Sequence, residues 1–122
     1  MLHLTIKEAV EGRYGDALAA AAELSQDALL LSLKNGVVIE LRFAAADEYA
    51  IAWRYGDAEL RIDTAPLHRE LASFPNHLHD AAGELRADPL TKPGAEPWDN
   101  LCAVLDALLV DPLLQATPAT VG

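Results

Sequence analysis

Apolar and polar positions alternate with a period of two between Ala28 and Asp63. Such alternation is typical of strands in an antiparallel sheet that buries one face and exposes the other. Turn-forming residues divide the stretch, and Asn35-Gly36, the preferred pair for a type I′ turn, predicts a hairpin between its first two segments. The predicted strands are Ala28–Leu33, Val37–Phe43, Glu48–Tyr55 and Ala58–Asp63, and Gly83–Ala87 is a candidate short edge strand.

Each predicted strand separates an apolar face from a polar one. The core-facing positions include Val37, Ile39, Leu41, Phe43, Tyr49, Ile51, Trp53, Tyr55, Leu60 and Ile62, and the opposite face carries Glu40, Arg42, Arg54, Glu59, Arg61 and Asp63. Opposite charges on neighbouring strands usually pair at a solvated surface, which is the plainer interpretation of this polar face. Arg61 and Asp63 lead directly into the next segment, so the alternative is that both belong to a functional site.

A helical pattern is expected before the strands. Thr5 and Glu8 match a capping box, which predicts a helix starting at Thr5. Gly12 and Gly15 weaken it, so we expect either a break near Tyr14 or two short helices, the second covering Asp16–Leu24.

A second helix is predicted near the end of the chain. Pro97 suits the first helical position, and Pro112 ends the pattern. Between them, Trp98, Leu101, Cys102, Leu105, Leu108 and Leu109 recur at steps of three and four residues. The predicted fold is therefore α+β: an antiparallel sheet of about four to five strands, with an N-terminal helical region and a C-terminal helix packed on one face. Residues 1–114 are expected to form a single domain and residues 115–122 a frayed tail.

Composition narrows the function. The formal net charge of −10 comes from 19 acidic and 9 basic residues, and the bases are scattered, which argues against a nucleic-acid binder with a continuous basic stripe. A small local site stays open. No apolar run reaches the roughly 18 residues that span a bilayer, and the first residues lack a signal-peptide pattern, so we expect a cytoplasmic protein without membrane contact. The lone Cys102 is interpreted as a buried apolar residue.

Candidate chemistry gathers in one segment, Ile62–His79. It holds three of the four histidines, His68, His77 and His79, together with Asp63, Pro66, Phe74 and Pro75. Imidazole titrates near neutral pH and is a common metal ligand, so its concentration in one segment points to chemistry. The two prolines favour an ordered loop rather than a strand. His3, in contrast, lies alone at an expected frayed start.

The same segment resembles the TumE family of proposed toxins in toxin-antitoxin pairs. The matching residues are Arg61, Asp63, Pro66, His68, Phe74, Pro75, His77 and His79, and the likeness extends over most of Ala28–Val110. Family members usually carry paired histidines after each proline, often followed by lysine and histidine, whereas this chain has Leu67 and Asn76 at the first position of each pair and no such lysine. The resemblance implies a toxin-like protein whose partner is an antitoxin carrying a DNA-binding domain.

Three functional interpretations follow from these residues. In the first, His68, His77, His79 and Asp63 form an acid-base cluster acting on RNA, with Arg61 stabilising charge on the phosphorane. A divalent metal version, with His77 and His79 as ligands, stays open. In the second, the segment is a structural loop in a protein-binding module, where Asp63 merely bonds a backbone amide two residues on. The third is an α+β domain without activity of its own. Whether the protein is an enzyme, and whether it forms homo-oligomers, stays open here.

Overall fold

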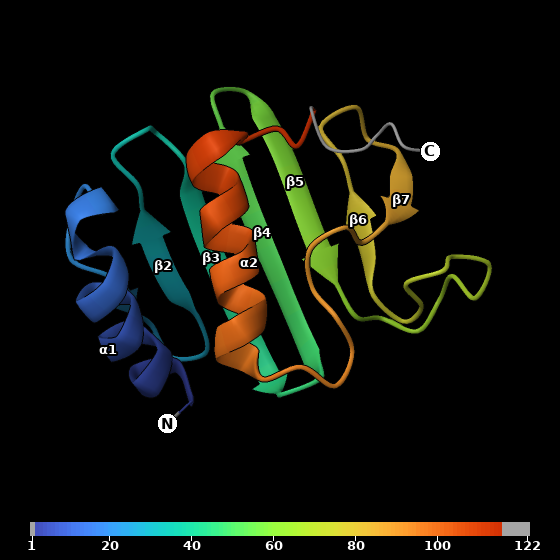
Figure 1. Cartoon of the computed structure of the whole chain (residues 1–122), viewed down its shortest axis with the longest axis horizontal. Coiled ribbons are helices and arrows are strands. Elements are labelled where there is room, and N and C mark those ends of the chain that lie inside the picture. The colour runs from blue at the N-terminus through green and yellow to red at the C-terminus, as the bar shows by residue number, and fades with distance from the viewer. Residues whose placement is uncertain (1, 116–122) are drawn as a thin grey trace.

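The computed structural model describes residues 2–115, which form one antiparallel sheet with two α-helices on one of its faces (Figure 1). The strands are β1 (Glu23–Leu24), β2 (Leu29–Ser32), β3 (Val38–Ala45), β4 (Glu48–Tyr55), β5 (Ala58–Asp63), β6 (His77–His79) and β7 (Leu85–Ala87). Helix α1 spans Leu2–Tyr14 and is followed by the 3₁₀ turn η1 (Gly15–Ala17), while α2 spans Pro97–Val110. The strands lie in the sheet in chain order, and each neighbouring pair is antiparallel.

The predicted α+β class, the two helical ends and strands β2 to β5 are confirmed, with the bounds of β4 and β5 as expected. Strand β7 lies within the predicted edge segment. The sheet nevertheless has seven strands in residues 2–115, more than the predicted four to five, because β1 and β6 were not expected. Of the predicted frayed tail, residues 116–122 lie outside the described part of the chain.

The predicted helix start at Thr5 and the predicted frayed start around His3 are both wrong. Helix α1 already begins at Leu2, so Thr5 lies inside it, and the ring of His3 accepts a hydrogen bond from the Phe43 amide at 3.0 Å. Of the two forms expected for this region, the break near Tyr14 is confirmed, and the alternative, a second helix over Asp16–Leu24, is reduced to the 3₁₀ turn η1. Its backbone pairs with β2 instead, through the Ala19 amide and Ser32 carbonyl at 2.7 Å and through β1.

The hairpin between β2 and β3 exists, but its turn differs from the predicted type I′. The Gly36 amide donates to the Leu33 carbonyl at 3.0 Å, and the Leu33 amide donates to the Val37 carbonyl at 2.8 Å. Of the turn residues, Gly36 has a positive φ of 98°, whereas a type I′ turn needs positive φ at both central residues. The connection is therefore a type I turn closed by a glycine bulge, with Asn35 Oδ1 accepting from the Val37 amide.

The hydrophobic core lies between one face of the sheet and the two helices. It includes Val10 and Tyr14 from α1, Leu101, Val104, Leu105 and Leu108 from α2, and Leu31, Ile39, Leu41, Ile51, Trp53, Leu60, Ile62 and Leu78 from the sheet. The helices also touch each other, because the Tyr14 hydroxyl donates to Asp106 at 2.7 Å. Leu109, predicted in the apolar stripe, is 38% exposed. No described helix is long and apolar enough to cross a membrane.

The opposite face of the sheet is not covered by either helix, and we call it the open face. Strand register arranges its side chains in rows that run across the strands. Row A contains Glu40, Ala52, Arg61 and His79; row B contains Arg42, Ala50, Asp63 and His77; row C contains Val38, Arg54 and Glu59. The four candidate residues of rows A and B at β5 and β6 thus reach the same surface as the polar residues of β3 and β4.

Candidate functional site

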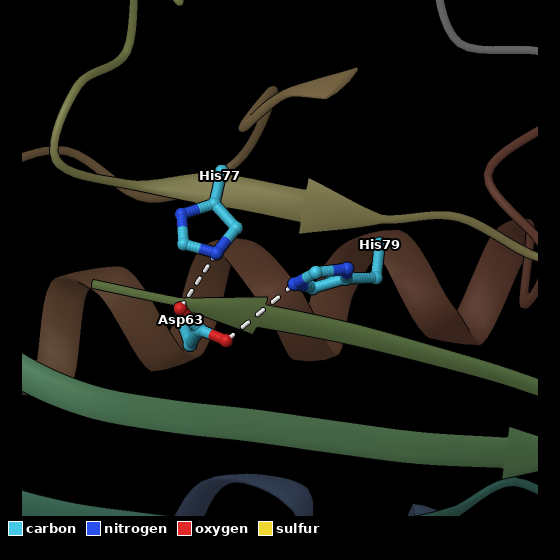
Figure 2. Close-up of side chains that lie close together, drawn as sticks. All are labelled: Asp63, His77 and His79. Carbon is cyan, nitrogen blue, oxygen red and sulfur yellow. Dashed lines mark ion pairs between the residues drawn. The ribbon is translucent and has the colours of Figure 1, made fainter. Parts of the chain in front are cut away.

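The pairing of β5 with β6 brings the predicted site residues together. Asp63 lies opposite His77, and Arg61 lies opposite His79, so all four side chains are neighbours on the open face. Figure 2 shows the two imidazoles of β6 directed at the Asp63 carboxylate of β5. The prediction that His77 and His79 lie in a loop is wrong, because both are strand residues. Pro66 and Pro75 fall in the connection before β6 and therefore do not interrupt it.

The Asp63 carboxylate is the centre of the arrangement. Its Oδ1 lies 2.7 Å from His77 Nε2 and accepts from the Ala65 amide at 3.1 Å. Its Oδ2 lies 2.9 Å from Arg61 Nε and 3.7 Å from His79 Nε2. The predicted bond to the amide two residues on is thus confirmed, but it uses only part of the carboxylate. The remaining contacts are with one guanidinium and two imidazoles.

His77 is buried, and its ring faces oxygen atoms on both sides. The side chain is 2% exposed, with Nε2 at Asp63 and Nδ1 3.2 Å from the carbonyl oxygen of Pro75. A neutral ring can donate to one of these oxygens, and a protonated ring can donate to both. Because so little of the ring is exposed, His77 can act on a substrate only through its neighbours.

His79 is the accessible imidazole of β6. Its side chain is 38% exposed, and its ring lies 5.0 Å from that of His77, centroid to centroid. Partial burial, followed by the positive charge of Arg61, lowers the pKa of His79 below the ordinary 6.5, and Asp63 opposes this shift. Arg61 Nη2 lies 3.4 Å from His79 Nε2. At neutral pH the ring is therefore mainly uncharged and able to accept a proton.

His68 approaches the site from the connection between β5 and β6, residues 64–76. Its ring lies 5.0 Å from the His77 ring in an edge-on arrangement, and its side chain is 32% exposed. The Nδ1 atom is 3.8 Å from Glu70 Oε2, close enough for an ion pair when the ring is protonated. The structure thus places two accessible imidazoles, His68 and His79, next to one buried imidazole.

A buried hydrogen-bond network on the opposite side of the sheet holds the end of this connection, and sequence reasoning missed it. Asn76 Nδ2 donates to the Tyr49 hydroxyl at 2.9 Å and to Thr91 Oγ1 at 3.1 Å, and Tyr49 donates to Thr91 at 2.8 Å. Asp88 bonds the Thr91 side chain and amide. Burial raises the pKa of Tyr49. Asn76 directly precedes the short strand β6, where the sequence has no hydrophobic period that could have indicated its inward direction.

Asp63, His77 and His79 could also hold a divalent transition metal. Ligand atoms of Asp63, His77 and His79 lie within 4.8 Å of one another, and the Pro75 carbonyl could orient the ring of His77 as such ligands require. Arg61, however, already contacts both Asp63 and His79. A metal ion held by these three residues would therefore lie next to the positively charged guanidinium, which would repel it.

Comparison with known proteins gives one family. A family model described as Toxin TumE matches residues 7–109, a range that includes the whole sheet, the site and nearly all of α2. Comparisons with curated proteins and with solved structures found no match.

Proposed function

The chain belongs to the TumE toxin family, and from this premise we propose that it is a toxin that cleaves RNA on its open face, through His79, His68 and Arg61. Membership of a toxin family implies an antitoxin partner. We further propose that this antitoxin carries a DNA-binding domain. The observation that supports the catalytic part is the Asp63 carboxylate, which holds a guanidinium at 2.9 Å beside an accessible imidazole.

Cleavage would proceed by transfer within the RNA strand. His79, uncharged at neutral pH, removes the proton of a ribose 2′-hydroxyl, and the 2′-oxygen attacks the adjacent phosphorus. The bond from phosphorus to the 5′-oxygen breaks, and protonated His68 gives its proton to that leaving oxygen. Arg61 stabilises the charge on the phosphorane. The products are a 2′,3′-cyclic phosphate and a free 5′-hydroxyl, and the reaction needs no metal ion.

Asp63 and His77 act as positioning residues in this scheme. Asp63 fixes Arg61 by the 2.9 Å contact, and His77 fills the space between the rings of His68 and His79. Their replacement should therefore lower kcat more than it raises KM, because substrate contacts stay while the geometry of the reacting groups is lost.

The acidic balance of the whole chain does not prevent local contact with phosphate. Arg54 and Arg61 lie on the open face, and Arg69 lies in the connection that carries His68. Screening at physiological salt limits the effect of distant carboxylates, since the Debye length is about 8 Å. We expect weak binding of RNA that depends on these few cations rather than on a long basic surface.

The test compares single substitutions in a growth assay and with purified protein. His79→Ala and His68→Ala should each abolish growth arrest and reduce cleavage at least about 100-fold, as loss of a general acid or base does. The control Arg42→Ala removes an exposed arginine of the same face that pairs with Asp27 and Glu40, and should leave cleavage unchanged. Melting temperatures of all variants separate catalysis from folding. Full cleavage by a folded His79→Ala variant would contradict the scheme.

Metal dependence is tested separately. Elemental analysis of protein purified without an affinity tag should find no stoichiometric transition metal, and cleavage should persist in EDTA. A stoichiometric metal lost together with cleavage in the Asp63→Ala variant would replace the acid-base scheme by a metal-dependent one.

A second candidate function is antitoxin binding by the connection of residues 64–76 without catalysis. It is supported by Leu67, which is 72% exposed beside His68. Large exposed apolar side chains often anchor protein interfaces. Leu67→Asp should then weaken the complex recovered on co-expression with the antitoxin, whereas Leu24→Asp, another exposed leucine at the far edge of the sheet, should not. Light scattering of the free chain will show whether copies associate with each other.

A further inference from the structure

A hollow in the open face adjoins the candidate site. It has a volume of about 490 Å³ and lies over β3, β4 and β5. Its wall includes Ala52, Arg61 and His79 of row A, and Val38, Arg54 and Glu59 of row C. The methyl group of Ala52 leaves the space that larger side chains would fill. Because Arg61 and His79 belong both to the site and to this hollow, a ligand bound in the hollow can reach the proposed reacting groups.

The spacing of the two rows suits a flat ring. Rows A and C are two residues apart along each strand, which in antiparallel strands is about 6.8 Å. A planar base with a van der Waals contact on each side needs roughly this distance. Arginine side chains stack well on nucleobases, and Arg61 and Arg54 stand on opposite sides of the gap. The hollow can therefore hold one base between the rows.

The charged groups of the wall differ in their availability. Glu40 is paired with Arg42 at 3.1 Å. Within residues 2–115, the side chains of Glu59 and Arg54 make no hydrogen bond or ion pair, although their strand positions are opposite each other. An unpaired carboxylate at the wall can accept two hydrogen bonds in parallel. An unpaired guanidinium nearby can contact a phosphate or a ring face.

We propose that the hollow binds the guanine base of RNA, with Glu59 accepting hydrogen bonds from guanine N1–H and the N2 amino group. Guanine is the base that presents two adjacent donors on its pairing edge. Adenine and cytosine have an acceptor beside their amino group, and uracil has its N–H between two carbonyls. Each of these three bases would therefore place an acceptor against a carboxylate oxygen, which repels it. This inference rests on the proposed RNA cleavage and adds its specificity.

The position of the base also sets the bond that is cleaved. We place the ribose of the same nucleotide beside Arg61 and His79, which also line the hollow. Its 2′-hydroxyl is then the group that His79 deprotonates. Cleavage is therefore expected on the 3′ side of guanosine.

The experiment has a binding arm and a cleavage arm. Each of the four nucleoside 3′-monophosphates is titrated into the full chain. Binding is measured from the shifts of the Ala52, Arg54 and Leu60 amide signals in NMR spectra. Guanosine 3′-monophosphate should bind roughly tenfold or more tightly than the others, the discrimination expected of a bidentate contact. Glu59→Gln should remove this preference, and the control Glu48→Gln, exposed on β4 outside the hollow, should keep it. Ala52→Leu, which fills the hollow, should weaken binding of all four.

Sequencing of the ends of a cleaved transcript gives the second arm. Guanosine should precede most cleaved bonds for the native chain, and Glu59→Gln should spread cleavage over all four bases. Cleavage without base preference, together with equal binding of the four nucleotides, would overturn this inference and leave the proposed function standing. Selective binding of the guanosine nucleotide without any cleavage would leave the binding site standing and overturn the proposed function.

Discussion

Replacing Asp63 by asparagine tests the geometry of the site through protein stability. Both carboxylate oxygens face N–H groups that cannot become acceptors: Oδ1 accepts from the Ala65 amide at 3.1 Å, and Oδ2 contacts Arg61 Nε at 2.9 Å. Asparagine has nearly the same shape but keeps one oxygen. Whichever way its amide is turned, its NH₂ group opposes one of these donors.

The expected loss follows from this mismatch. The side chain of Asp63 is 12% exposed, so water replaces the missing acceptor only in part. An unsatisfied buried hydrogen-bonding group costs about 1–3 kcal/mol. For a domain of this size, about 3–6 °C of melting temperature corresponds to each kcal/mol. Asp63→Asn should therefore lower the melting temperature by about 3–18 °C.

Urea unfolding followed by circular dichroism measures the change directly. The midpoint should fall while the slope of free energy against urea stays the same, since the surface exposed on unfolding is unchanged. The control is Asp57→Asn at an exposed turn, which should stay within about 0.5 kcal/mol of the native chain. A stability of Asp63→Asn within that same margin would refute the assigned contacts of the carboxylate.

Three further predictions concern single groups. In NMR titrations the pKa of His79 should lie below 6.5 and should rise in Arg61→Gln, and an unchanged or lower value in that variant would refute the role of Arg61. Because the pKa of this ring is lower in the folded chain than in the unfolded chain, its protonation destabilises the fold as the pH falls from 7 through the folded pKa. Tyr49→Phe removes a buried hydroxyl that is hydrogen-bonded to Thr91, Asn76 and Asn100. The free energy of unfolding in urea should fall by about 1–3 kcal/mol, and an unchanged value would mean that water replaces the hydroxyl. Gly36→Ala should cost about 1 kcal/mol through its φ of 98°, since the added Cβ meets Tyr55 only at an ordinary 3.8 Å; a stabilised variant would contradict the turn.

The strands that sequence alone could predict are those whose burial alternates over many residues. Strands β3 and β4 each extend over eight residues with alternate burial for most of their length, so the period of two is clear from side-chain type alone. Strand β1 has two exposed residues, and β6 has three residues, two of which are histidines. Neither carries a readable hydrophobic period. Both form because a neighbouring strand supplies hydrogen bonds, and this pairing depends on the tertiary structure rather than on the local sequence.

The composition of the candidate site was predictable, but the different environments of its members were not. The unusual density of histidines singled out His68, His77 and His79 with Asp63. Local sequence does not distinguish His77, 2% exposed, from His79, 38% exposed. That difference comes from the register of β6 against β5 and from the connection that covers His77. Likewise, the Arg54 and Glu59 side chains have no polar partner among residues 2–115 because of neighbours that only the folded sheet supplies.

The order of the strands has a consequence for motion. Strands β6 and β7 are three residues each and complete one edge of the sheet, while β2 to β5 and α2 contain most of the core. Local opening of a short edge hairpin requires less free energy than unfolding of the whole chain. Such an opening would carry away both imidazoles of β6 and leave Arg61 and Asp63 in place. A partner that holds this hairpin open would therefore take the proposed site apart and leave the rest of the fold intact.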